Sequence, residues 1–140
     1  MPKVSKSSAS SHLVVPGLTE SHGEDINGWN VSLAADDKDL DLARLFKGAP
    51  NNLCQASHLG YVIKGKFGVR KADGTEEIYE AGDAFVIEPG HTPLSFAGGE
   101  YVAFTSSEDA KWQAAVMMPN MPQFAKDQGV ELPEDLAMPS

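Results

Sequence analysis

The stretch "GYVIKGKFGVRKADGTEEIYEAGDAFVIE", residues 60–88, decides the fold class of this chain. Its apolar residues Tyr61, Ile63, Phe67 and Val69 alternate with polar or small residues, which is the period-two pattern of a half-buried β-strand. Two turn signals, "ADGTE" and "AGD", divide the stretch into short segments. The stretch therefore predicts antiparallel strands joined by tight turns.

Further strand and turn signals lie on both sides of this stretch. On the C-terminal side, "PGHTP" predicts a turn, and "AGG" separates "LSF" from the strand-like "EYVAFTS". On the N-terminal side, "GWNVSLA" predicts a strand, and "DLDLARLFKG" predicts a short helix or turn that ends at Gly48. Short strands at this spacing are typical of a small β-sandwich or barrel, here over residues 25–106.

The two ends of the chain have a different composition. Residues 1–24 are rich in Ser and Gly, which predicts a flexible segment, although "HLVVPGL" can add an edge strand to a sheet. Residues 107–140 begin with a helix signal, because "SSEDAKWQAAVM" opens with a serine cap and acidic residues. We expect Pro119 to end that helix and a loosely held tail to follow.

Composition and charge restrict the class of protein. A chain of 140 residues fits one domain and needs no metal merely to fold, so that a bound metal would be functional. The formal charge of −9, with 11 unclustered basic residues, disfavours nucleic acid and anionic membrane surfaces as partners. The single Cys54 excludes an internal disulfide, and no long apolar run is present. We therefore expect a soluble, cytoplasmic protein.

Two short stretches carry residue types that bind metals. "CQASHLGYVIKG" places Cys54 four residues before His58, so that both lie on one side of either a strand or a helix. "AGDAFVIEPGH" ends at His91, where a second strand pair would bring it close to them. Imidazole and thiolate ligands favour a transition metal such as zinc, copper, iron or nickel over manganese or magnesium.

These two stretches resemble the signature motifs of the cupin superfamily, over about residues 51–106. The resemblance implies an all-β fold, a cupin-type small β-barrel with a jelly-roll-like double sheet, and a metal bound between the sheets. Counting back seven residues from Gly65 in the first motif, His58 occupies the position of the family's glutamate. Cys54 occupies the position of the second family histidine, and Asn52 that of the first.

The second motif departs from the family pattern at its ligand. Gly82 and Gly90 match, but Pro93 stands at the histidine position and His91 lies two residues earlier. In an extended chain a shift of two residues keeps the side chain on the same face, so that His91 can still point into the barrel. The turn at Pro89 leaves that orientation open.

Several residues have alternative interpretations. Cys54 is either a metal ligand or an inert buried wall residue. Gln55 is either a fourth donor to the metal or a hydrogen-bonding partner of the strand, and the second interpretation is favoured. Tyr61 either directs its hydroxyl into the pocket or packs its ring in the wall, and again the second is favoured.

The remaining candidates are given weaker roles. Glu77 and Glu88 are acid–base candidates only if they are buried near the metal. His12 and His22 lie in the segment expected to be flexible, so that we expect them to be solvated and to have no role in the site. The aromatic residues expected in the hydrophobic core are Trp29, Phe85 and Phe96.

Two hypotheses of function follow, and the fold does not choose between them. In the first, a small metal-dependent enzyme acts on a small polar metabolite held in the barrel mouth. In the second, the same pocket binds a small molecule without catalysis. We also expect a homodimer, because a barrel this small leaves sheet edges that a second copy can cover.

Overall fold

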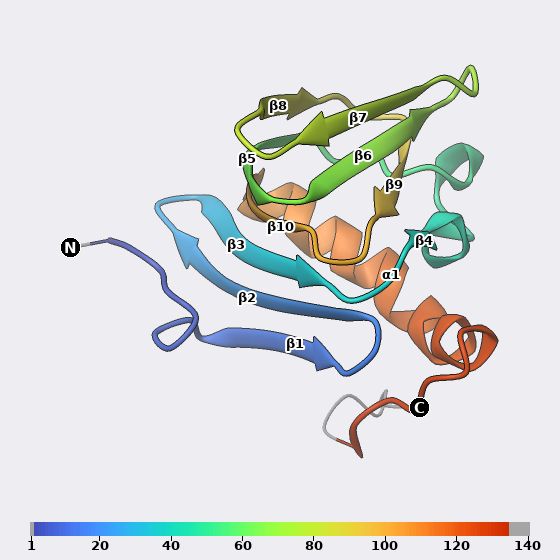
Figure 1. Ribbon diagram of the computed structural model, residues 1–140, viewed down its shortest axis with the longest axis horizontal. Helices are drawn as coiled ribbons and strands as arrows, with labels where there is room; N and C mark the ends of the chain where they lie inside the picture. Colours follow the sequence, from blue (N-terminus) through green and yellow to red (C-terminus); the bar gives the residue numbers. More distant parts are fainter. Residues whose placement is uncertain (1, 135–140) are drawn as a thin grey trace.

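The computed structural model describes residues 2–134 and consists of ten strands, two short 3₁₀ helices and one α-helix within that range (Figure 1). The elements are, in chain order, β1 (Ser11–Val15), β2 (Thr19–Ile26), β3 (Trp29–Asp36), β4 (Leu40–Asp41), η1 (Ala43–Phe46), η2 (Pro50–Asn52), β5 (His58–Lys64), β6 (Lys66–Lys71), β7 (Glu76–Glu80), β8 (Ala84–Ile87), β9 (His91–Ser95), β10 (Glu100–Ser106) and α1 (Ser107–Asp127). Residues 135–140 of the expected tail lie outside the described residues.

The strands form two antiparallel sheets. The larger sheet has six strands in the order β1-β2-β3-β10-β5-β8, and the smaller sheet has four in the order β4-β9-β6-β7. Helix α1, orange in Figure 1, runs behind β10 as drawn and contacts η1, β10 and β3. The predicted all-β double sheet with a C-terminal helix is confirmed.

The segment expected to be flexible, residues 1–24, instead contributes ordered strands from residue 11 onward. Strand β1 is the edge of the larger sheet, as expected for "HLVVPGL", and β2 pairs with β3 along its whole length. Val15 and Leu18 are almost completely buried and belong to the main hydrophobic cluster. A few apolar residues at contact positions therefore order a segment whose overall composition is polar.

The helix does not end at Pro119 as expected. It continues through Pro119 and Pro122 to Asp127, although each proline removes a backbone hydrogen bond. Two features compensate for this loss. The side chain of Asn120 donates to the carbonyl oxygens of Leu45, Lys47 and Val116, and the last turns bury three apolar side chains, Met121, Phe124 and Ala125.

The interior contains two hydrophobic clusters. One lies between the sheets and is formed by Val62, Phe67, Val69, Phe85 and Ile87. The other joins α1 to η1 and the β1–β2 turn, and it includes Cys54. Phe85 is buried as predicted, whereas Trp29 is 43% exposed and Phe96 is half-buried. Trp29 is the first residue of β3 and lies beside the turn of the β2–β3 hairpin.

In β5 the alternating apolar residues Tyr61 and Ile63 lie on the exposed face of the strand and not on its buried face. Val62 points inward and is buried, while Leu59, Tyr61 and Ile63 are 42%, 46% and 56% exposed. The chain passes from the larger to the smaller sheet at Gly65, whose φ of 63° permits the turn. Because β5 and β6 belong to sheets that face each other, the odd-numbered residues point away from the interior in β5 and toward it in β6, as Phe67 and Val69 do. The hydroxyl of Tyr61 is therefore excluded from the interior.

Within residues 2–134, no helix is both long enough and apolar enough to cross a membrane.

Candidate metal centre

Cys54, His58 and His91 meet at one place in the structure. Cys54 follows η2, His58 begins β5 and His91 begins β9. One ligand atom from each residue lies within 4.8 Å of the others. In the described part of the chain, this is the single group of three or more His, Cys, Asp or Glu residues with such spacing.

The backbone holds Cys54 against His91. The N–H of Cys54 donates to the carbonyl oxygen of His91 at 2.7 Å, and the N–H groups of Gly90 and His91 donate to the carbonyl oxygen of Cys54 at 2.8 and 3.3 Å. Gly90 adopts a φ of 94°, which favours glycine and explains the "PGH" sequence at the turn. His91 is 2% exposed, so that its side chain points inward and the orientation left open by the sequence is settled.

The imidazole of His91 is arranged to accept at Nε2. Its Nδ1 lies 2.8 Å from the carbonyl oxygen of Glu88, which can only accept, so that the proton is on Nδ1. The Nε2 atom is buried and has no hydrogen-bond partner. Burial lowers the pKa of His91, and the hydrogen bond to Glu88 partly opposes this effect. A neutral imidazole with a free, buried lone pair fits a metal ligand.

His58 faces the same point from the other sheet. Its Nδ1 is hydrogen-bonded to the hydroxyl of Thr105 at 2.7 Å, and its Nε2 lies 3.8 Å from the Sγ of Cys54. The His58 and His91 rings are edge-on, with centroids 5.5 Å apart. The pKa of His58 is lowered to about 4, chiefly by burial and also by the nearby His91, while Asp109 opposes both effects. This imidazole is therefore neutral at physiological pH.

Cys54 combines the burial expected of a wall residue with the position expected of a metal ligand. Its side chain is fully buried within the cluster that includes Phe46 and Ala56, as expected for a wall residue. Its Sγ also faces the two histidines. The pKa of the thiol is raised to about 11, chiefly by burial and also by the charge of Asp109, while the N–H of Ala56 opposes both effects. Without a cation nearby, the thiol is protonated.

The other candidates from the first motif lie outside this group. Gln55 donates through Nε2 to the carbonyl oxygens of Pro50 and Leu53, so that its amide serves the loop. Asn52 is exposed, and its Oδ1 accepts from the N–H of Gly48. Glu77 and Glu88 are also exposed, which removes the condition under which they were acid–base candidates.

The prediction for His12 and His22 is corrected. The two residues are opposite each other on β1 and β2, and their Nδ1 atoms are in contact. His22 is 8% exposed, and its Nε2 lies 2.6 Å from an oxygen of Glu20. His22 is therefore a buried, hydrogen-bonded residue of the sheet, whereas His12 is exposed.

Two residues that support the site were missed by sequence reasoning. Thr105 orients His58 from β10, and Asp109 accepts a hydrogen bond from the N–H of Ser57 at 3.1 Å in the segment between Cys54 and His58. Thr105 is 47 positions away from His58 along the chain, and β-strand pairing brings the two together. Asp109 lies in the acidic first turn of α1, which as a local signal indicates only where a helix begins.

A cavity of about 300 Å³ adjoins the three residues. His58 and His91 line it, together with residues from both sheets and from α1. Most of its lining is apolar, with a few polar side chains, as is typical of sites for small molecules. Three possible ligands beside a cavity would leave a fourth coordination position open to a bound ion, as in catalytic rather than structural zinc sites.

Comparison with solved structures identifies the fold. Ectoine synthase from P. lautus is 9% identical and superposes with a TM-score of 0.55, covering 76% of this chain and 78% of that one. The polyketide cyclase RemF from Streptomyces resistomycificus is 13% identical, with a TM-score of 0.52 and coverage of 76% and 79%. The chain has the cupin fold. An RmlC-like cupin from Shewanella frigidimarina is 20% identical, with coverage of 69% and 82% and a TM-score of 0.48.

Comparisons of the sequence with family models and with curated proteins found no match. At these identities the structural likeness establishes the cupin fold alone. The activity of this cupin-fold protein has to be inferred from its own residues.

Proposed function

We propose that this protein binds one divalent transition metal through Cys54, His58 and His91 and uses it on a small polar molecule held in the cavity. The observation that carries the proposal is the buried, unpartnered Nε2 of His91, which faces a thiol and a second neutral imidazole. A buried polar atom without a partner is costly in a folded protein, and a metal ion would remove that cost.

The donor set supports a choice among metals. One thiolate and two imidazoles favour zinc, copper, iron or nickel, because hard cations such as magnesium prefer oxygen ligands. The glutamate that the cupin motif would supply is replaced here by His58. Zinc is our first expectation for a mixed sulfur and nitrogen site of this kind.

The proposed chemistry is Lewis-acid activation. A bound divalent ion would polarise a carbonyl oxygen or lower the pKa of a water molecule at the free coordination position. The protein's own contribution is to bury the site, to fix the tautomer of His91 through Glu88, and to orient His58 through Thr105. The small molecule would enter the cavity that His58 and His91 line.

A non-catalytic binding role is the second candidate. It is favoured by the exposure of Glu77 and Glu88, which leaves no carboxylate of that pair beside the metal to transfer protons. Both roles need an open coordination position, which separates them from a purely structural ion that would be closed to added ligands.

The proposal is tested by the metal content of the purified full-length protein. We expect about one equivalent by elemental analysis after dialysis against zinc, and affinity lower by more than about 100-fold in His91→Ala, because even outer-shell losses cost about 10–100-fold. His12→Ala is the matched control, since His12 is exposed and distant from the triad in the sheet. Equal metal content in His91→Ala and wild type would contradict the proposal.

The free position is tested after replacement of zinc by cobalt(II). Added imidazole should change the visible spectrum of the cobalt protein if a coordination position is open. An unchanged spectrum, together with tight metal binding, would favour a closed structural site over both proposed roles.

A further inference from the structure

Asp36, the last residue of β3, is a buried carboxylate that the metal site does not use. It is 4% exposed and lines the same cavity as His58 and His91. The hydroxyl of Thr19 donates to its Oδ1 at 3.1 Å, whereas Oδ2 is buried without a hydrogen-bond partner. Among the described residues, the only other buried side-chain atom in this condition is Nε2 of His91.

The two unpartnered atoms belong to opposite ends of the cavity. His91, Pro93 and Ser95 share one face of β9 and all line the cavity. Ser95 is close enough to Asp36 for its hydroxyl to influence the carboxyl, while His91 belongs to the metal site. Four residues of a strand span about 13 Å. The cavity wall therefore runs from the metal site to Asp36.

Strand β10 shows the same arrangement. Tyr101, Ala103 and Thr105 line the cavity, and Thr105 is bonded to His58. At the other end, the negative charge of Asp36 contributes to the raised pKa of Tyr101, after burial as the larger cause. Two neighbouring strands thus connect the same two polar ends.

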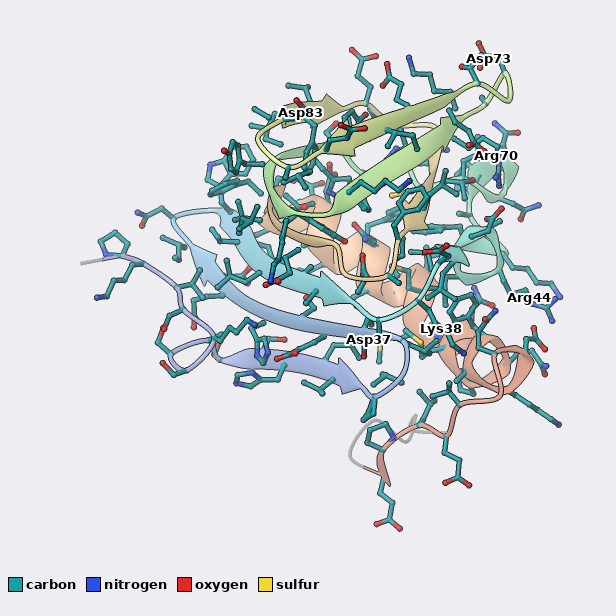
Figure 2. The ribbon with its side chains drawn as sticks, in the orientation of Figure 1. Asp37, Lys38, Arg44, Arg70, Asp73 and Asp83 are labelled. Atoms are coloured by element: carbon teal, nitrogen blue, oxygen red, sulfur yellow. The ribbon has the colours of Figure 1, made fainter. Side chains whose placement is uncertain are left out.

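The charge of the lining indicates which group Asp36 would bind. Within residues 2–134, no lysine or arginine lines the cavity. Arg44 and Arg70 project outward in Figure 2, and Arg70 is paired with Asp41 at the surface. Burial raises the pKa of Asp36 to about 6, while the hydroxyls of Thr19 and Ser95 lower it. The carboxyl is therefore largely ionised at neutral pH with one oxygen unused.

We propose that Asp36, with Thr19 and Ser95, forms a subsite for the ammonium group of a small molecule whose other end reaches the metal site. A protonated amine supplies both the positive charge and the N–H donors that the ionised carboxylate lacks. A carboxylate or phosphate at this end would meet a like charge without any cation. The ammonium subsite is argued from Asp36 and its surroundings and does not depend on a bound metal. Only the contact between the other end of the small molecule and the metal site rests on the proposed function.

The subsite is tested with hexylamine as the probe and 1-hexanol as the uncharged control of equal length. Titrations of the full-length protein, after removal of metal by a chelator, are followed by amide NMR shifts at pH 8. We expect hexylamine to bind at least about tenfold more tightly than hexanol, because charge-assisted hydrogen bonds are about twice as strong as neutral ones. The amine-specific shifts should centre on Thr19, Asp36 and Ser95.

Asp36→Asn should abolish the preference for hexylamine over hexanol. Equal affinities in the wild type, or a preference that survives Asp36→Asn, would overturn the subsite. If the variant does not fold, the wild-type shift map decides, because amine-specific shifts centred elsewhere would also overturn it.

A second titration examines the bridging ligand in the zinc-loaded protein. 6-Aminohexanoate should bind at least about tenfold more tightly than either hexylamine or hexanoate, since both ends are then engaged. No gain would overturn the bridging part. If the protein prefers hexylamine but binds no metal, that result would contradict the proposed function and would still support the ammonium subsite.

Discussion

Cys54 and His91 are joined by a two-way backbone bridge, in which each residue donates its N–H to the carbonyl oxygen of the other, at 2.7 and 3.3 Å. The bridge positions the thiol and one imidazole before any ion is bound. Both side chains are also buried in the packed interior, so that neither relies on a metal for its placement. The centre is therefore preorganised, and folding and metal binding should be separable.

Removal of metal should leave the fold intact. Chelation is expected to preserve the far-UV circular dichroism spectrum. It should lower the free energy of unfolding, and with it the melting temperature, only by the linkage term, which is about 3–4 kcal/mol when the free metal was at 100–1,000 times the dissociation constant. The measurement is thermal unfolding with and without a chelator. Loss of the β-sheet spectrum on chelation would show that the bridge does not hold the site.

Thr105→Val should weaken metal binding without unfolding the protein. The hydroxyl of Thr105 lies 2.7 Å from Nδ1 of His58 and orients the ring, and losses of this kind cost about 10–100-fold in metal affinity. Competition with a chromophoric chelator measures the change. Thr92→Val is a matched control, since Thr92 is also buried in a strand but makes no hydrogen bond to the three residues. Equal losses in both variants would contradict the role of Thr105.

Metal affinity should rise with pH because of Cys54 rather than the histidines. Burial holds the pKa of His58 at about 4 and lowers that of His91, so that both rings are neutral by about pH 7. The Cys54 thiol, with a pKa of about 11, must lose a proton to bind. The affinity should therefore increase about tenfold per pH unit between about pH 7 and 9.

Cys54→Ala is the control for this slope. Its weaker metal binding should be nearly independent of pH over the same range, because no thiol is ionised. A flat profile in the wild type would identify Cys54 as a wall residue only. Labelling by a thiol reagent does not separate the two roles, since a buried thiol with a raised pKa reacts slowly with or without metal.

Asp36→Asn should stabilise the protein at pH 8 and change little at pH 4. The native pKa of Asp36 is raised from 3.8 to about 6, so that the native state holds the proton more tightly than the unfolded state. The free energy of unfolding therefore falls as pH rises through about 4–6, by at most about 3 kcal/mol. Urea unfolding at the two pH values measures it, with the exposed Asp37→Asn as control. A less stable Asp36→Asn at pH 8 would contradict this account.

We propose that the free edge at β8 pairs with a second copy of the chain. Strand β8 ends the larger sheet, and its Val86 is 70% exposed beside Leu59 on β5. Phe104, 38% exposed, extends this apolar strip from β10. Light scattering should report a dimer for the wild type at micromolar concentration and a monomer for Val86→Glu, because a charge disfavours edge pairing.

Ile78→Glu is the matched control for this prediction. Ile78 is 41% exposed on β7, at the edge of the smaller sheet, and its substitution should leave the dimer intact. A monomeric wild type would remove the proposal, and dissociation by Ile78→Glu alone would place the contact on the other sheet.

The sequence by itself determined the fold class and the membership of the candidate site. Alternating apolar residues and the turns at Gly74, Gly82 and Gly90 are local signals, because each glycine adopts a positive φ that its turn requires. The spacing of Cys54 and His58 is also local. These features do not depend on which strands finally pair.

Tertiary structure decided everything that depends on contacts between distant segments. It ordered β1 and β2 through Val15 and Leu18, and it carried α1 past Pro119, because packing outweighs local propensity. It also turned Tyr61 outward and brought Asp36 into the same cavity as His91. Burial, which sets the pKa of Cys54 and of Asp36, exists only once two sheets face each other, and no local pattern encodes it.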